Sequence, residues 1–539
     1  MHYRLVTPLF LKESLYSENK STTQNGAVFK MGKVNLDALI PREDFEYKEE
    51  SSQSDTSNNS PTLKLSDLEI KDTFFYPVLR KPDFQRETNE WIPNKIFGLI
   101  NSFVSQDLIP AIIMWNQKGS FTFVIDGGHR LSALIAWVND DYGDGQISRN
   151  FFETIPEEQR KIADNVRKRV DSEIGSYITY KNAVSSPKGL DEKLVQKARD
   201  LSRHTLQLQW VKGDAKKAEE SFFRINQEAS KINKTELTLL KSREYPNGIA
   251  SRAIKNSGMG HKYWQHFDIE TQKEIEKTAK EISELIFIPP YKKPVDSLEL
   301  PIAGKSNSAI ALPLILNFVN IVNGALEKEN EKDEDGNITL AYLKRCKEIA
   351  QKINSKESSS LGLLPLLYFY SEYGDYRTPS FYAIVALLLK FEKDKTLQTN
   401  FIKVRKDFEK IILEYGESIY QISRRYREGI KGYSHITNFY IEIIKKLLER
   451  KPKKEFIKEL LDREKLKVIS SPKEFSLNIK SSVFISEAIK KALKCKICGG
   501  LIYSKSITID HIKRKSEDGL GTIDNAQIAH PYCNTTYKN

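Results

Sequence analysis

The chain has 539 residues, of which 29% are charged and 39% hydrophobic, so it is too long for one ordinary core and too polar for a membrane protein. Its formal net charge of +12 favours an anionic partner such as nucleic acid, although charge alone does not identify one. No segment approaches the ~18 consecutive apolar residues of a membrane span, and residues 1–20 lack the order of a secretory signal. We therefore expect a cytoplasmic protein of several domains without a membrane partner.

The N-terminal part begins with a segment of low apolar content. Residues 41–64 are rich in Ser, Asn, Asp and Glu and show no apolar periodicity, which is typical of a flexible linker. We assign residues 1–64 to an arm and this linker. From 65 to 245, apolar runs of strand length alternate with helical patterns, which predicts a mixed α/β domain. The expected strands are FFYPVL, IPAIIMW, FTFVID and HTLQLQWV, and the expected helices are NEWIPNKIFGLINSFVSQ and HRLSALIAWV.

A glycine turn joins the strand FTFVID to the helix that follows. Asp126 ends the strand, Gly127 and Gly128 allow close backbone approach, and His129 and Arg130 open the helix. Amide donors at a helix N-terminus beside an arginine can bind an anion, and phosphate is the natural ligand. Glycine pairs also make ordinary strand-to-helix connections, so the turn alone does not decide between the two interpretations.

The middle of the chain, residues 246–480, has helical periodicity, as in SFYAIVALLLKF and ITNFYIEIIKKLLERK, and we expect a helical domain there. Residues 445–480 contain 12 Lys or Arg and 6 Asp or Glu, a surplus of 12 − 6 = 6 positive charges. This surplus fits a solvated helix face and a surface that contacts DNA phosphates equally well.

The last part, residues 481–539, contains three of the four cysteines. Cys495 and Cys498 form a C-x-x-C pair, and His530 with Cys533 form a second pair at the same spacing. Four such ligands predict one tetrahedral zinc ion with a structural role. Between the pairs lie ITIDHI and GLGTIDNAQIAH, and a plain zinc ribbon needs neither the Asp-His dipeptide nor the asparagine after the glycine turn.

This segment resembles the HNH endonucleases, the ββα-metal nucleases whose zinc-stapled members read C-x-x-C, D-H, N and a closing C/H-x-x-C. The resemblance implies that His511 is the general base that activates water and that Asp510 ligates a catalytic Mg²⁺ or Mn²⁺ ion. It further implies that Asn525 orients His511 and that Asn534 completes the metal site. His530 stands where many members have cysteine, and histidine ligates zinc equally well. The chemistry is reasonable in itself, because phosphodiester hydrolysis needs a base and a hard cation.

The α/β segment resembles the ParB/sulfiredoxin-like domain of GmrSD-type and Ssp-type restriction proteins. The resemblance rests on PDFQR, on the Asp-Gly-Gly-His-Arg turn and on FFRIN, which come in the family's order, although the family's Pro-Tyr-x-Trp run is reduced here to Trp91. It implies a nucleotide site formed by Gln85, Arg86, Asp126, Gly127, Gly128, His129, Arg130 and Asn226. The nucleotide, GTP, ATP, CTP or UTP, is left open, as is its hydrolysis.

We thus expect a multidomain α+β protein: a ParB/sulfiredoxin-like domain, a helical domain and a zinc-stapled HNH module. The predicted function is Mg²⁺-dependent DNA cleavage with a nucleotide-binding sensor, in restriction of foreign or modified phage DNA. One alternative is a nucleotide-switched DNA-binding regulator whose zinc module is only structural. Another is a nuclease without nucleotide dependence. The expected partners are DNA and a nucleoside triphosphate, and a homo-oligomer is among the assemblies left open.

Overall fold

The computed structural model describes residues 33–43, 59–71, 73–85, 88, 91–117, 121–152, 155–229, 238–239, 242–306, 308, 310–325, 331–425, 432–449, 453–463 and 477–538. The chain divides into two compact units. The first comprises Met1–Pro41, Tyr47–Arg80 and Glu87–Ala218, and the second comprises Arg42–Glu46, Lys81–Arg86 and Glu219–Asn539.

The first unit is built on a mixed sheet in the order β3-β5-β4-β6-β2. Strand β3 pairs in parallel with β5 and β4 in parallel with β6, whereas β5–β4 and β6–β2 are antiparallel. The end of β3 crosses into the second unit, where it pairs with β1. The strands are β1 (Arg42–Glu43), β2 (Thr62–Lys64), β3 (Leu79–Pro82), β4 (Ile112–Asn116), β5 (Thr122–Asp126) and β6 (Thr205–Trp210).

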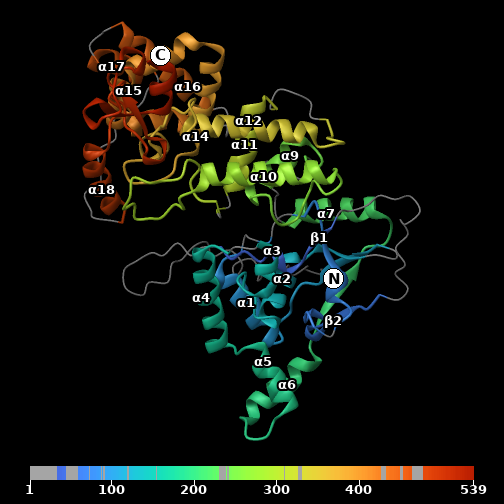
Figure 1. Ribbon diagram of the computed structural model, residues 1–539. Helices are drawn as coiled ribbons and strands as arrows, with labels where there is room; N and C mark the ends of the chain where they lie inside the picture. The colour runs from blue at the N-terminus through green and yellow to red at the C-terminus, as the bar shows by residue number, and fades with distance from the viewer. Residues whose placement is uncertain are drawn as a thin grey trace, which may run out of the picture. The chain divides into compact units, whose positions relative to one another are not determined.

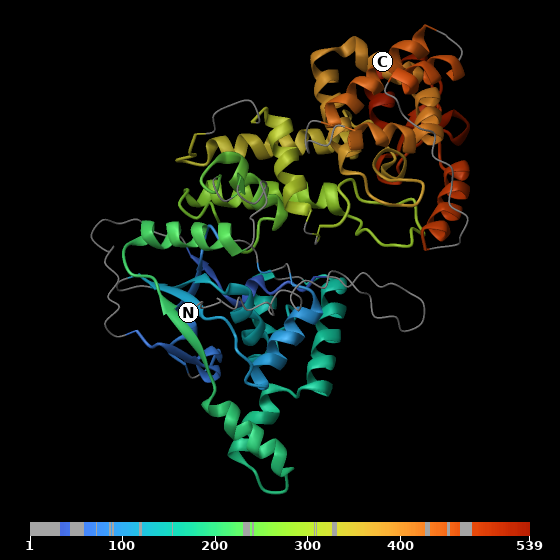
Figure 2. The same ribbon diagram turned by 180° about the vertical axis from the view of Figure 1, so that it is seen from behind.

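Helices α1, α2 and α4 pack together beside this sheet, and the core of the unit is aliphatic, with Ile96, Ile100, Val124 and Leu134 fully buried. Helices α5 and α6 pack on each other and project from the rest of the unit (Figures 1 and 2). The helices are α1 (Pro93–Val104), α2 (Gly128–Val138), α3 (Gln146–Phe152), α4 (Glu157–Glu173), α5 (Tyr177–Ser185) and α6 (Glu192–Arg203).

The expected mixed α/β character of this segment is confirmed. The predicted FFYPVL strand is mostly absent: residues Tyr76–Val78 form a 3-10 turn and only Leu79 belongs to β3. Pro77 explains the difference, because proline fixes φ and has no N–H to donate to a sheet. The ParB/sulfiredoxin-like assignment and the domain boundaries stay predictions.

The second unit is helical, as its periodicity predicts. Helices α9 to α12 form one group, and α14 to α16 pack on each other in a second (Figure 1). The helices are α7 (Ala215–Ala229), which starts in the first unit, α9 (Pro246–Lys255), α10 (Ile269–Phe287), α11 (Ala311–Asn323), α12 (Asn337–Ile353), α13 (Pro365–Phe369), α14 (Thr378–Lys393), α15 (Lys395–Arg425), α16 (Gly432–Leu448), α17 (Lys453–Arg463) and α18 (Leu477–Lys491). Residues 450–452 and 464–476 of the basic 445–480 segment lie outside the described residues.

The cysteine-rich end of the chain belongs to the same unit and shares its hydrophobic core. Cys495, Leu501, Tyr503 and Cys533 are buried in one cluster with residues of α13 to α16. Its own elements are a two-stranded antiparallel sheet of β7 (Thr508–His511) and β8 (Ala526–Ala529), and a π-helical turn at Cys533–Tyr537. Among the described residues, none of the helices combines the length and apolar content that crossing a bilayer requires.

Candidate active site and zinc centre

The two predicted ligand pairs come together in space. The ligand atoms of Cys495, Cys498, His530 and Cys533 all lie within 4.8 Å of one another, and three of the four residues are buried. His530 Nδ1 lies 3.4 Å from the Cys498 sulfur and 3.7 Å from the Cys533 sulfur. Three thiolates and one imidazole at this separation fit a structural tetrahedral zinc ion.

The imidazole of His530 is oriented by its second nitrogen. Nε2 lies 3.0 Å from the Leu501 carbonyl oxygen and donates to it, which leaves Nδ1 to face the thiols. Burial, and then the nearby Arg405 charge, lower the pKa of His530 and keep the ring neutral. Hydrogen bonds from Cys498 and Cys533 lower the pKa of Cys495, whereas donating to Cys495 raises the pKa of Cys498 to about 11. A neutral imidazole suits metal binding.

A buried ion pair on helix α15 contacts the Cys/His cluster. Arg405 Nε donates to Glu409 Oε1 at 2.7 Å, and both side chains are almost completely shielded from solvent. Arg405 Nη1 donates to the Leu361 carbonyl at 2.7 Å and lies 3.2 Å from His530 Nδ1. Glu409 Oε2 accepts from the Leu501 amide at 2.6 Å. The pair thus ties the helix to both halves of the cysteine module.

Asp510 and His511 end strand β7, where the β7–β8 register places them opposite Gln527 and Ala526. Successive side chains of a strand point to opposite faces, so the two residues differ in environment. Asp510 is buried and His511 is half-buried. The carboxylate therefore faces the protein, while the imidazole lies on the same face of the strand as the exposed Ile509.

Two side chains hold the Asp510 carboxylate. Its Oδ2 accepts from Gln527 Nε2 at 2.7 Å and from Lys538 Nζ at 2.8 Å. The Lys538 ammonium also donates to the His511 carbonyl, so one cation bridges both residues of the dipeptide. A divalent ion at Asp510 would share the carboxylate with this ammonium.

Asn525 contacts the loop that follows His511 and not the imidazole itself. Its Oδ1 accepts from the Lys513 amide at 2.7 Å, and its Nδ2 donates to the Lys513 carbonyl at 3.1 Å and the Leu520 carbonyl at 2.7 Å. Its backbone carbonyl accepts from the Ile512 amide at 2.9 Å. Asn525 therefore fixes the backbone directly after His511, and its predicted orienting role can act only through that backbone.

Asn534 lies on the turn after the second zinc pair. Its Nδ2 donates to the Ile509 carbonyl at 3.2 Å, which brings the amide beside strand β7 next to Asp510. The amide oxygen is the side-chain atom that could ligate a cation. Oxygen donors from Asp510 and Asn534 suit Mg²⁺ or Mn²⁺ rather than zinc. The catalytic roles of all four residues stay predictions.

In the first unit, the Asp126–Arg130 turn has the expected strand-to-helix geometry. Gly127 has φ +93°, and a Cβ there would lie 2.6 Å from the Ile112 side chain, so the position requires glycine. Arg130 donates to Asp126 Oδ2 at 2.7 Å and to the Pro110 carbonyl at 2.8 Å. Nη1 and Nη2 each therefore already have one acceptor within the protein, and a phosphate would compete with Asp126 for the charge of the guanidinium.

The structure describes the side chains of some of the other predicted nucleotide-site residues but not of all. Gly128 is the first residue of α2, and the His129 ring stacks on Trp91 with centroids 5.7 Å apart. Gln85 is buried and belongs to the second unit. Asn226 lies on α7, but its side chain is outside the described residues, as is all of Arg86. The nucleotide site as a whole stays a prediction.

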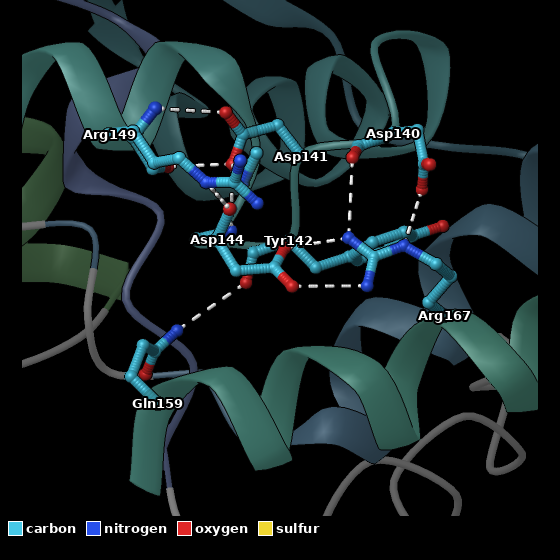
Figure 3. Close-up of polar contacts among 10 residues, drawn as sticks. Asp140, Asp141, Tyr142, Asp144, Arg149, Gln159 and Arg167 are labelled. Carbon is cyan, nitrogen blue, oxygen red and sulfur yellow. Dashed lines mark hydrogen bonds and ion pairs between the residues drawn. The ribbon is translucent and has the colours of Figure 1, made fainter. Parts of the chain in front are cut away.

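An acidic loop follows helix α2 and is held by internal contacts (Figure 3). Arg167 pairs with Asp140 and Asp144, at 2.6 Å in each case. Asp141 accepts from the Ser148 hydroxyl at 2.6 Å and from the Gly145 amide at 2.9 Å. The three carboxylates thus have protein partners, and the loop anchors the C-terminal end of the helix that begins with the glycine turn.

Sequence reasoning missed three polar residues of the second unit, namely Lys538, Arg405 and Glu409. Lys538 lies 28 positions from Asp510, and Arg405 lies 125 positions from His530. No local motif spans such separations. The i,i+4 spacing of Arg405 and Glu409 does indicate a helical ion pair, but not its burial against a metal centre.

Comparison with protein families agrees with this arrangement. Residues 62–244 match the family model described as GmrSD restriction endonuclease, N-terminal domain, and residues 495–539 match the model of HNH endonuclease. No curated protein and no solved structure is significantly similar to the chain. The predicted fusion of a GmrSD-type N-terminal domain with a C-terminal HNH endonuclease domain is confirmed.

Proposed function

We propose that this chain, which joins a GmrSD-type domain to an HNH endonuclease domain, is a zinc-stapled restriction endonuclease that hydrolyses DNA with Mg²⁺ or Mn²⁺. The observation that carries the proposal is the dipeptide Asp510-His511. It lies on a strand held between the two zinc-ligand pairs, with the carboxylate buried and the imidazole accessible. The net positive charge of the chain suits a DNA substrate.

The residues divide the chemistry between them. His511, as general base, removes a proton from the attacking water, for which a half-exposed imidazole is suited. Asp510 and Asn534 would hold the divalent cation, which supplies charge neutralisation at the phosphate and the leaving oxygen when bound. Asn525 fixes the backbone after His511 and thereby the direction in which the imidazole points.

We further propose that the Asp126–Arg130 turn binds the phosphates of a nucleoside triphosphate and that this binding controls cleavage. The helix N-terminus and the Arg130 guanidinium support the proposal. Phosphate would replace Asp126 as the partner of Arg130, so occupancy would release a carboxylate at the end of β5. The biological role that we propose is defence against foreign or modified DNA, in the cytoplasm.

The competing function is a DNA-binding regulator whose zinc module is only structural. Supercoiled plasmid and phage genomic DNA, incubated with the full chain and Mg²⁺ or Mn²⁺, separate the two. The nuclease yields nicked or linear DNA in the presence of the divalent ion and none in its absence. Binding without strand cleavage, with each ion and each of the four NTPs, would favour the regulator.

A further inference from the structure

Large aliphatic side chains are exposed along the β7–β8 hairpin that carries His511. Ile509, Ile512, Leu520 and Ile523 are 61%, 55%, 72% and 93% exposed. One exposed aliphatic residue needs no explanation, but four within residues 509–523 indicate an interaction surface. Ile509 lies two positions before His511 on β7, and strand alternation places both on one face. The apolar surface therefore adjoins the proposed general base.

Hydrogen bonds fix the backbone of the loop that carries Leu520 and Ile523. The Arg514 carbonyl accepts from the Glu517 amide at 3.0 Å and from the Gly519 amide at 2.9 Å, and Asn525 bonds to both Lys513 and Leu520. A Cβ at Gly519 would lie 2.0 Å from the Lys513 carbonyl oxygen, so this tight turn requires glycine. The backbone contacts thus fix the loop although Leu520 and Ile523 stay 72% and 93% exposed.

Basic and acidic residues beside this surface are equal in number, so basic residues are available for phosphate contacts but the loop has no net positive charge. Lys513, Arg514 and Lys515 follow His511 after Ile512 and can contact phosphates. Glu517, Asp518 and Asp524 in the same loop balance these three charges. Recognition at the loop tip must therefore come from apolar contact more than from net charge.

We infer that Leu520 and Ile523 form an apolar wedge that enters the minor groove of duplex DNA and unstacks a base step beside the scissile phosphate. Aliphatic side chains that enter the minor groove separate stacked bases and bend the duplex, which costs free energy at each unstacked step. A step that is already mismatched or distorted needs less free energy to unstack. The wedge thus predicts a preference for mismatched or distorted duplex over intact duplex. This inference rests on the proposed nuclease function.

The test uses the full chain with His511→Ala, which allows binding without cleavage. The duplex is one that the wild type cuts, with 2-aminopurine at the step next to the mapped cleavage position, in intact and mismatched forms. The wedge variant adds Leu520→Ser and Ile523→Ser. The matched control adds Ile269→Ser, which changes an aliphatic residue that is 69% exposed at the start of α10.

The parent and the control should raise 2-aminopurine fluorescence several-fold on binding and should bind the mismatched duplex about tenfold more tightly than the intact one. The wedge variant should lose both effects, with an unchanged dependence of affinity on salt because the basic residues remain. Retention of the fluorescence change and of the mismatch preference by the wedge variant would overturn the inference. So would a dimeric parent that the wedge substitutions convert to a monomer, because the surface would then join two copies. A wild type that neither cuts nor binds any DNA would instead refute the proposed function.

Discussion

Lys538 is the residue whose contacts bear most directly on divalent-ion binding. Its ammonium lies 2.8 Å from Asp510 Oδ2, so a divalent cation on that carboxylate would be repelled by a like charge. Such repulsion at this range is worth about 1–4 kcal/mol. Lys538→Met should therefore tighten Mn²⁺ binding by about tenfold or more, measured as the loss of the free Mn²⁺ electron-spin signal.

Lys505→Met is the control for this change, because Lys505 donates to the Ile288 carbonyl and contacts no carboxylate that we assign to the metal site. It should leave Mn²⁺ affinity as it is in the wild type. Unchanged or weaker Mn²⁺ binding by Lys538→Met would show that the ammonium does not compete with the ion, and that the cation binds away from Asp510.

Arg405 tests whether the buried ion pair holds helix α15 to the zinc centre. Removing one member of a fully buried pair leaves the other charge uncompensated and typically costs about 3–5 kcal/mol. Arg405→Met should lower the free energy of unfolding by about this amount and should speed zinc loss to a chelator, since His530 loses its neighbour. The exposed Lys403→Met on the same helix should do neither. Denaturant midpoints and zinc release that match the wild type would contradict the supporting role.

At the scale of elements, the cysteine module is a short hairpin and turn held by the knuckle Cys495–Cys498. Structural zinc supplies much of the folding energy of so small a module. Cys498→Ser should reduce bound zinc from about one per chain to near none, as elemental analysis would show. Its hairpin amides should lose protection against hydrogen exchange, while those of β4 and β5 in the other unit stay protected. A zinc-free module with unchanged protection would refute a metal-stabilised fold.

The elements that could be predicted from the sequence are those with regular apolar periodicity. FTFVID and HTLQLQWV contain β5 and β6, IPAIIMW contains β4 except its last residue, and the helix HRLSALIAWV is α2 without its first residue. The prediction of a strand at FFYPVL was wrong, because Pro77 has no N–H to donate to a sheet and disfavours a strand despite the apolar run. The four clustered Cys and His residues could be found from local spacing alone. Lys538 and Arg405 could not be found in this way. Tertiary packing brings Lys538 to Asp510 across 28 positions and Arg405 to His530 across 125 positions.

At the scale of the whole molecule, the Asp126–Arg130 turn and the Asp510-His511 dipeptide belong to separate compact units, whereas Gln85 and Asn226 of the predicted nucleotide site belong to the same unit as the dipeptide. Control of cleavage by a nucleotide then requires that the nucleotide bind one state of the protein better than another, and a tenfold preference corresponds to about 1.4 kcal/mol. Arg130→Ala removes the proposed phosphate contact and should weaken nucleotide binding, and it should change the cleavage rate although the HNH residues are intact. The measurement compares wild type and variant on one DNA substrate with each of the four NTPs.

Arg169→Ala is the control for that comparison, because Arg169 pairs with Glu173, donates to Asn94 and lies over the Phe97 ring. It should keep the nucleotide response of the wild type. If no NTP alters wild-type cleavage and Arg130→Ala cuts at the same rate, the turn is only a connection between β5 and α2. The nuclease proposal would survive that result, and the sensor proposal would not.

The central claim is that His511 is the base of a metal-dependent DNA hydrolysis, and imidazole rescue tests it most directly. Single-turnover cleavage is measured for the wild type and His511→Ala with saturating Mg²⁺ or Mn²⁺, with and without added imidazole. The variant should cut about 10²- to 10⁴-fold more slowly, keep its zinc and its DNA affinity, and recover part of its rate with imidazole. Cleavage by His511→Ala at the wild-type rate would contradict the account and place the active centre elsewhere in the chain.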